Sequence, residues 1–150
     1  MKVLGLGALE QRLQHDLNII GYPLNEWVPE RFTKEGERVL DVLIVGAGQG
    51  GLAIAFQLMR ERVNNVLVID KAEPGTEGPW INYARMPILR SPKEVNGPDL
   101  NIPSLSFQAW YEAQFGASSW EAMGKIPTKM WMDYLVWYRS ILQLPVENWV

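Results

Sequence analysis

Residues 40–70 constrain the fold of this chain more than any other stretch, because two apolar runs flank a glycine-rich turn. The first run, Val42–Val45, is unbroken, which is typical of a parallel strand covered by helices on both faces. The segment GAGQGG follows directly, and beyond it apolar residues recur at helical spacing. The second run, 66–69, ends at Asp70. This order predicts a strand, a tight turn, a helix and a second parallel strand.

Three positions of the turn each require glycine for a different physical reason. Gly46 allows the tight turn out of the strand, Gly48 lets a pyrophosphate approach the backbone, and Gly51 lets the helix pack closely. The helix is expected to begin near Gly50 and to direct its free N–H groups and positive dipole end at the phosphates. The pattern indicates a dinucleotide-binding turn, and a purely structural turn in an α/β domain is the alternative.

Asp70 gives this turn a second feature of dinucleotide-binding proteins. It follows the second strand directly, at the distance where a carboxylate accepts hydrogen bonds from the adenosine ribose hydroxyls. A carboxylate at this position repels a 2′-phosphate, so the site is expected to prefer FAD or NAD to NADP.

Charge and composition exclude several other classes of protein. The net charge is −3 and the basic residues are scattered, which argues against nucleic acid or an anionic membrane as the partner. The chain has no cysteine, so disulfides, thiolate metal sites and the flavin-linked disulfide reductases are excluded. No apolar stretch is long enough to cross a bilayer, and residues 1–9 are interpreted as helix rather than signal peptide. A cytoplasmic location is the default expectation, and no metal site is predicted.

Residues 1–40 are predicted to form an N-terminal helical arm, and residues 41–150 the nucleotide-binding domain. The arm is expected to pack on the outside of that domain through four apolar residues at helical spacing: Leu9, Leu13, Leu17 and Ile20. The one histidine, His15, has polar neighbours and is predicted to be a surface residue rather than a ligand or base.

Residues 71–104 are rich in proline and glycine and are predicted to form a long ordered loop. The loop carries Trp80, Arg85, Arg90 and Lys93. These side chains are either solvated or line a flavin and its phosphates. The second interpretation is favoured, because the loop leaves the strand end at which open α/β sheets bind their ligands.

Residues 105–144 are predicted to be helical again. Ser106 and Thr128 are expected to cap two helices, and Gly116 to end the first. Five of the seven tryptophans lie between Trp110 and Trp149, and core packing of amphipathic helices is favoured over an aromatic substrate pocket. Residues 146–150 are expected to begin another strand.

Several segments together resemble a known family of enzymes. DVLIVGAGQGGLAIAFQL, VLVIDK, EGPW, YARMPILRSPK, LSFQAWYEAQFG and IPTKMWMDYLVWYR are similar to the N-terminal part of the FAD- and NAD(P)-dependent flavoprotein monooxygenases. Within these, the flavin-containing monooxygenases and the lysine or ornithine N-hydroxylases are the most similar. The resemblance covers residues 38–150 and is strongest at the glycine motif.

The resemblance implies a set of cofactor-binding residues. The FAD pyrophosphate would contact the glycine turn: Gly46, Gly48, Gln49, Gly50 and Gly51. Asp70 would contact the adenosine ribose, and Lys71 would lie beside the adenine. The segment Gly78, Pro79 and Trp80 would reach toward the flavin end of the cofactor. A last group would approach the isoalloxazine: Arg85, Met86, Leu89 and Arg90.

The chain also departs from the family pattern. Family members are several hundred residues long and carry a second glycine motif and a Phe-x-Gly-x-x-x-His-x-x-x-Trp fingerprint, both absent here. One strand-helix-strand unit does not make the usual sheet of five or six strands. The expected fold is therefore α/β: a Rossmann-like FAD-binding βαβ unit with an N-terminal helical arm and a following helical segment, forming an incomplete domain.

The leading functional hypothesis is the FAD-binding portion of an NAD(P)H-dependent flavoprotein monooxygenase. In such enzymes NADPH or NADH reduces the flavin, and O₂ then gives a flavin hydroperoxide that oxygenates a nucleophilic small-molecule substrate. No catalytic acid or base is predicted, because the cofactor carries the chemistry. The alternatives are the Rossmann half of an NAD-dependent dehydrogenase and a non-catalytic dinucleotide-binding module. The sequence indicates neither the substrate nor the oligomeric state.

Overall fold

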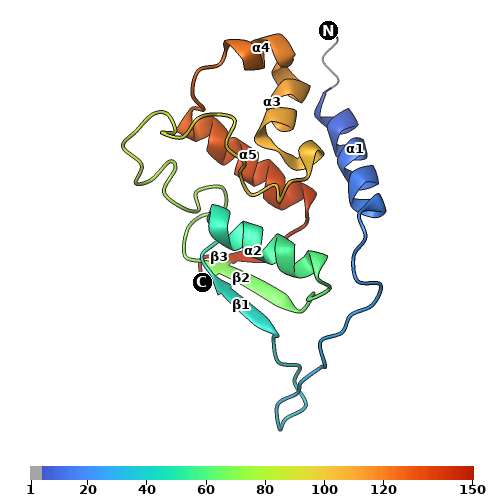
Figure 1. Ribbon diagram of the computed structural model, residues 1–150. Coiled ribbons are helices and arrows are strands. Elements are labelled where there is room, and N and C mark those ends of the chain that lie inside the picture. The colour runs from blue at the N-terminus through green and yellow to red at the C-terminus, as the bar shows by residue number, and fades with distance from the viewer. Residues whose placement is uncertain (1–4) are drawn as a thin grey trace.

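The computed structural model describes residues 5–150 and places a layer of helices on a small sheet (Figure 1). In chain order the elements are α1 (Leu6–Ile19), β1 (Val42–Val45), α2 (Gln49–Arg60), β2 (Val66–Asp70), the 3-10 helix η1 (Pro103–Leu105), α3 (Phe107–Phe115), α4 (Ala117–Ala122), α5 (Thr128–Ile141) and β3 (Val146–Asn148). The α/β class and the Rossmann-like βαβ unit are confirmed. The first four residues of the segment interpreted as helix lie outside the described residues.

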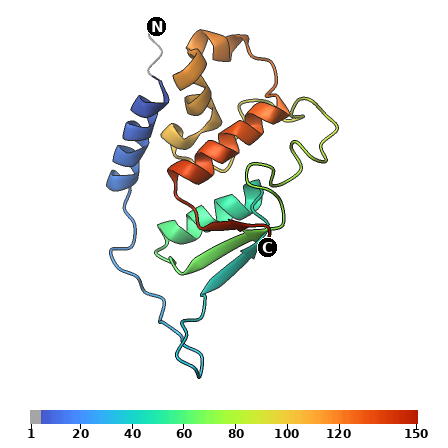
Figure 2. The same ribbon diagram turned by 180° about the vertical axis from the view of Figure 1, so that it is seen from behind.

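The sheet has three parallel strands in the order β1-β2-β3. The expected third strand is confirmed as β3, which follows α5 and pairs with β2 at the sheet edge (Figure 2). Helix α2 covers one face, where Ile44, Val68 and Ala55 are buried. On the other face Leu43 is 51% exposed and Val45 is 80% exposed. The prediction that both faces of the first strand are covered is therefore wrong for residues 5–150, whose helices lie on one face only.

Aromatic side chains of α5 form the centre of the helical layer. Tyr134 and Tyr138 are fully buried, and their hydroxyls donate to the carbonyls of Leu105 (2.7 Å) and Pro98 (2.8 Å). Burial raises the pKa of both tyrosines well above the ordinary value. Four of the five C-terminal tryptophans are buried in the same layer: Trp110, Trp120, Trp131 and Trp137. The core interpretation of these tryptophans is confirmed.

Helix α1 packs against α3 and η1 at the side of the helical layer (Figure 1). Leu13 is fully buried, and His15 is exposed as expected. The Asp16 carboxylate accepts hydrogen bonds from Ser104 Oγ (2.7 Å) and Arg12 Nε (2.8 Å), which together lower its pKa. The arm helix is thus attached by the buried Leu13, by the hydrogen bond from Ser104 to Asp16, and by the hydrogen bond from Trp137 Nε1 to Glu10 Oε1 at 3.0 Å.

The helix caps differ in part from the sequence prediction. Ser106 caps α3 as expected, since its Oγ accepts from Ala109 N–H at 3.1 Å, and Gly116 ends that helix. The cap prediction for Thr128 is wrong, because α5 has Pro127 at its N-cap. The Thr128 hydroxyl instead donates to the Met86 and Pro87 carbonyls, at 3.3 Å each. An additional short helix, α4, follows Gly116, and residues 71–102 form the expected loop without helix or strand.

Candidate dinucleotide site

The turn between β1 and α2 is held in place by a contact that only glycine permits. Gly46 has a φ of +104°, and its N–H donates to the Ile69 carbonyl at 2.7 Å, which fixes the turn to β2. A Cβ on Gly51 would lie 1.9 Å from the Gly46 carbonyl oxygen. The start of α2 therefore lies directly against the end of β1, as the third glycine of the motif predicts.

The N-terminus of α2 is open toward the carboxyl end of the sheet. Gly48 is the N-cap, and no side chain among the described residues caps it. A Cβ built on Gly48 would have Gly78 Cα as its nearest neighbour, at 3.6 Å, so two glycines of distant segments adjoin here. Backbone N–H groups of Gln49, Gly50 and Gly51 begin the helix and are suited to an anion.

Asp70 binds the glycine turn directly. Its Oδ2 accepts from Ala47 N–H at 2.7 Å, and its Oδ1 accepts from Ala72 N–H at 2.8 Å. Each carboxylate oxygen has a further lone pair, so Asp70 can accept ribose hydroxyls without releasing the turn. Lys71 follows with an exposed side chain.

A buried carboxylate orders the loop that carries Gly78. Glu77 is 4% exposed, and its Oε1 accepts from Arg139 Nη1 (2.6 Å) and Asn148 Nδ2 (2.7 Å). Its Oε2 accepts from Gly75 N–H at 2.8 Å. Since a buried charge is tolerated only when paired and hydrogen-bonded, these contacts fasten the loop to α5 and β3.

Two tryptophan rings lie beside the turn. Trp131 Nε1 donates to Gln49 Oε1 at 3.2 Å, and the Trp131 ring packs edge-on against Trp80 at 6.2 Å between centroids. Gly97 must lack a side chain here, because a Cβ would lie 2.7 Å from the Trp131 ring. Trp80 Nε1 lies close to Gly78 and is buried without a hydrogen-bond partner among residues 5–150. A buried donor of this kind is a place where a bound group is expected to supply an acceptor.

The structure brings only some of the loop residues together. Trp80, Arg85 and Met86 line one open cavity of about 620 Å³ beside the first turn of α5. Arg90 does not line it: its side chain is exposed, and its carbonyl accepts from Lys125 Nζ. The predicted residues thus form one group around the glycine turn and a second around Trp80, with Arg90 apart from both.

Sequence reasoning missed the residues that support this arrangement. Glu77 lies inside a segment that the family resemblance uses, but no pattern marks it as buried. Arg139 and Asn148 are its partners from 62 and 71 positions away. Nothing in the local sequence of α5 or β3 indicates these contacts.

The fold and the turn define the protein as a dinucleotide-binding protein of the Rossmann-like type. The chain belongs to the FAD-NAD(P)-binding family, whose profile matches residues 43–150. Within residues 5–150 no helix is long and apolar enough to span a membrane.

Two curated proteins are similar to the chain. It is 55% identical over 145 residues to an FAD-dependent urate hydroxylase of Xanthomonas campestris pv. campestris, an alignment that covers 97% of this chain and 30% of that protein. It is 33% identical over 99 residues to the FAD-binding monooxygenase andJ of Emericella variicolor, covering 49% of this chain and 16% of that protein. The chain therefore spans less than a third of either relative. No solved structure matches it.

Gly51→Ala is expected to destabilise the fold, because the new Cβ meets the Gly46 carbonyl at 1.9 Å. The loss should be about 3 kcal/mol or more in the free energy of unfolding, measured by urea denaturation. Gly50→Ala is the control, since its Cβ would meet no atom within 4 Å and alanine favours helix. Equal stability of the two variants would contradict the steric account of the turn.

Arg139→Met is expected to cost about 3 kcal/mol of stability, because it leaves the buried Glu77 carboxylate without its cation. Lys129→Met removes another cation from the same helix, where the Lys129–Asp133 pair is exposed, and should cost at most about 0.5 kcal/mol. Chemical denaturation of both variants measures the difference. A similar loss in both would show that Glu77 does not depend on Arg139.

Proposed function

We propose that this chain is the FAD-binding portion of an NAD(P)H-dependent flavoprotein monooxygenase, with an arm at residues 1–40 and the cofactor domain at 41–150. The main support is the close approach of Gly48 and Gly78 beside the N-terminus of α2, which no side chain among the described residues caps. The chain spans 30% of its urate hydroxylase relative, so the reaction of the whole enzyme is part of the proposal.

The residues around Gly48 and Gly78 have the chemistry that FAD binding needs. The pyrophosphate would lie at Gly46, Gly48, Gln49, Gly50 and Gly51, where no side chain stands in front of the helix N–H groups. Asp70 would accept the ribose hydroxyls, and Lys71 would lie beside the adenine. Gly78 and Trp80 would continue toward the flavin, with Arg85 and Met86 beyond them in the adjoining cavity. Arg90 is separate from the rest of this set, because it is exposed and does not line that cavity.

When bound and reduced by NADH or NADPH, FAD would supply the chemistry by which O₂ oxygenates a nucleophilic substrate. The chain's own residues bind and orient it. Trp80 and Trp131 pack together, and Trp131 donates to Gln49 at the turn, so the two rings would shield that side of the bound cofactor. The buried Glu77 ties the segment that carries Gly78 to α5 through Arg139, so the two glycine segments keep their spacing.

The substrate we propose is a small nucleophilic molecule of the urate type. The 55% identity to a protein named as a urate hydroxylase supports this class, and the net charge of −3 favours it over nucleic acid. A cytoplasmic location completes the proposal, supported by a sequence without cysteine.

Gly48→Ala tests the proposed pyrophosphate site at Gly48 without disturbing the fold. The new Cβ would meet Gly78 Cα at 3.6 Å, an ordinary contact, while occupying the space proposed for the pyrophosphate. Calorimetric titration of the chain should give binding of FAD, weaker binding of NAD and weakest binding of NADP, and Gly48→Ala should abolish FAD binding with unfolding unchanged. Unaltered FAD affinity in this variant would refute the site. A preference for NAD would favour the dehydrogenase alternative instead.

Trp80→Phe tests whether the unpartnered indole N–H serves the cofactor. We expect a rise in the FAD dissociation constant of about fivefold, equivalent to one hydrogen bond of about 1 kcal/mol, with no loss of apo stability. Trp110→Phe is the control, since Trp110 Nε1 is also buried without a partner but belongs to the helical core. Fluorescence titration with FAD measures both variants, and equal effects would argue against a Trp80 contact.

A further inference from the structure

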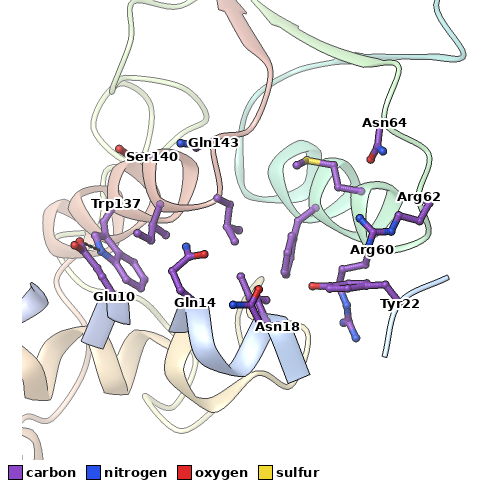
Figure 3. Close-up of a pocket in the computed structure, with 15 residues that line it drawn as sticks. Glu10, Gln14, Asn18, Tyr22, Arg60, Arg62, Asn64, Trp137, Ser140 and Gln143 are labelled. Atoms are coloured by element: carbon purple, nitrogen blue, oxygen red, sulfur yellow. Dashed lines mark hydrogen bonds between the residues drawn. The ribbon is translucent and has the colours of Figure 1, made fainter. Parts of the chain in front are cut away.

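A second cleft lies between α1, α2 and α5, with a volume of about 730 Å³ (Figure 3). It is lined by the middle of α1, by the last turns of α2 and α5, and by Tyr22 and Asn64. Helix α2 begins at the glycine turn and ends here, at Arg60. The cleft and the dinucleotide site therefore lie at opposite ends of one helix and are separate.

Two arginines dominate one end of the cleft. The guanidinium carbons of Arg60 and Arg62 lie 5.9 and 5.3 Å from the centroid of the Tyr22 ring. Arg62 Nε donates to the Pro23 carbonyl at 2.8 Å, which fixes the side chain. Arg62 also has a φ of +61°, a backbone conformation that glycine usually supplies after a helix. Glycine would adopt this backbone conformation with less strain. The chain nevertheless has a long cationic side chain at this position of the cleft.

The two arginines have no carboxylate partner among residues 5–150. Arg60 Nε is buried and has no hydrogen-bond acceptor in the part of the chain that the structure describes. The one carboxylate that lines the cleft, Glu10, lies at the other end and accepts from Trp137 Nε1 at 3.0 Å (Figure 3). Glu61 accepts from Gln57 Nε2 and Glu26 accepts from Asn64 Nδ2, and among residues 5–150 neither carboxylate forms an ion pair with the arginines.

Attraction to the negative end of the α2 dipole accounts for one arginine in the last turn. It gives the buried Nε of Arg60 no acceptor and does not require Arg62 to turn into the same cleft. A ligand oxyanion in the cleft would interact with both arginines, because the terminal N–H donors of guanidinium groups bind carboxylate and phosphate oxygens.

We propose that this cleft binds a small organic anion, whose oxyanion group contacts the guanidinium groups of Arg60 and Arg62 and whose polar body extends toward α1. The lining of the cleft also includes amide and hydroxyl side chains that could bind such a body: Gln14, Asn18, Ser140 and Gln143. Apolar side chains of Leu17, Phe56 and Met59 line it as well. The volume lies in the range of small-molecule sites. The ligand carries either a carboxylate or a phosphate, and both present the same oxygen acceptors to the arginines.

The proposal is tested by titrating the chain at low salt with inorganic phosphate and, separately, with citrate. Weak binding in the millimolar range is expected for at least one of them, and the tighter one identifies the anion class. In ¹H–¹⁵N spectra the Trp137 indole N–H and the Arg60 Nε–H should shift. Arg60→Met and Arg62→Met should each weaken binding by about tenfold or more.

Two control variants separate the cleft from other sources of anion binding. Gly48→Ala alters the glycine turn and should leave anion binding at the cleft unchanged. Arg38→Met removes the same charge from the distant Arg38–Glu30 pair and should also leave it unchanged. Loss of binding in Gly48→Ala, equal weakening by Arg38→Met, or the absence of binding by both anions would overturn the proposal. If Arg60→Met does not fold, the test rests on Arg62→Met. The Arg62 side chain is only partly buried, so its replacement should leave the fold intact.

Discussion

The contact between the end of β1 and the start of α2 is the constraint on which the nucleotide site depends. Because a Cβ on Gly51 would lie 1.9 Å from the Gly46 oxygen, the helix can begin at this distance only with glycine. The hydrogen bond from Gly46 N–H to Ile69, and that from Ala47 N–H to Asp70, then fix the same turn to β2. Strand, turn, helix and acid thus form one rigid unit that directs the N–H groups of α2 outward.

A buried carboxylate extends that rigid unit to parts of the chain far away in sequence. A loop as long as residues 71–102 would be costly to order, because each ordered residue loses conformational entropy. Glu77 offsets this cost with hydrogen bonds to Gly75, Arg139 and Asn148. Since Arg139 and Asn148 belong to α5 and β3, the helical layer and the third strand contribute to the placement of Gly78 beside Gly48.

Features that depend on residues close together in the chain could be predicted from the sequence. Features that depend on contacts between residues far apart in the chain could not. The glycine turn, both strands that flank α2 and the Ser106 cap follow from residues close together in the chain, and each is confirmed. Thr128 has the right residue type for a cap, but its hydroxyl is used by the carbonyls of Met86 and Pro87, more than forty positions away in the chain. The open face of β1 was missed because an apolar run reads the same whether one or both of its faces are covered. The Glu77 contacts have no local signal at all.

The two proposed sites lie at opposite ends of helix α2, and different groups attract the anion at each end. At its N-terminus the backbone N–H groups and the dipole favour an anion, so the proposed pyrophosphate site needs no basic side chain. At its C-terminus the dipole repels an anion, so Arg60 and Arg62 must supply the positive charge. Binding at the cleft should therefore depend on salt more steeply than binding at the turn, where hydrogen bonds to fixed backbone groups contribute most. Two anion sites on one helix are physically consistent because one is built from backbone and the other from side chains.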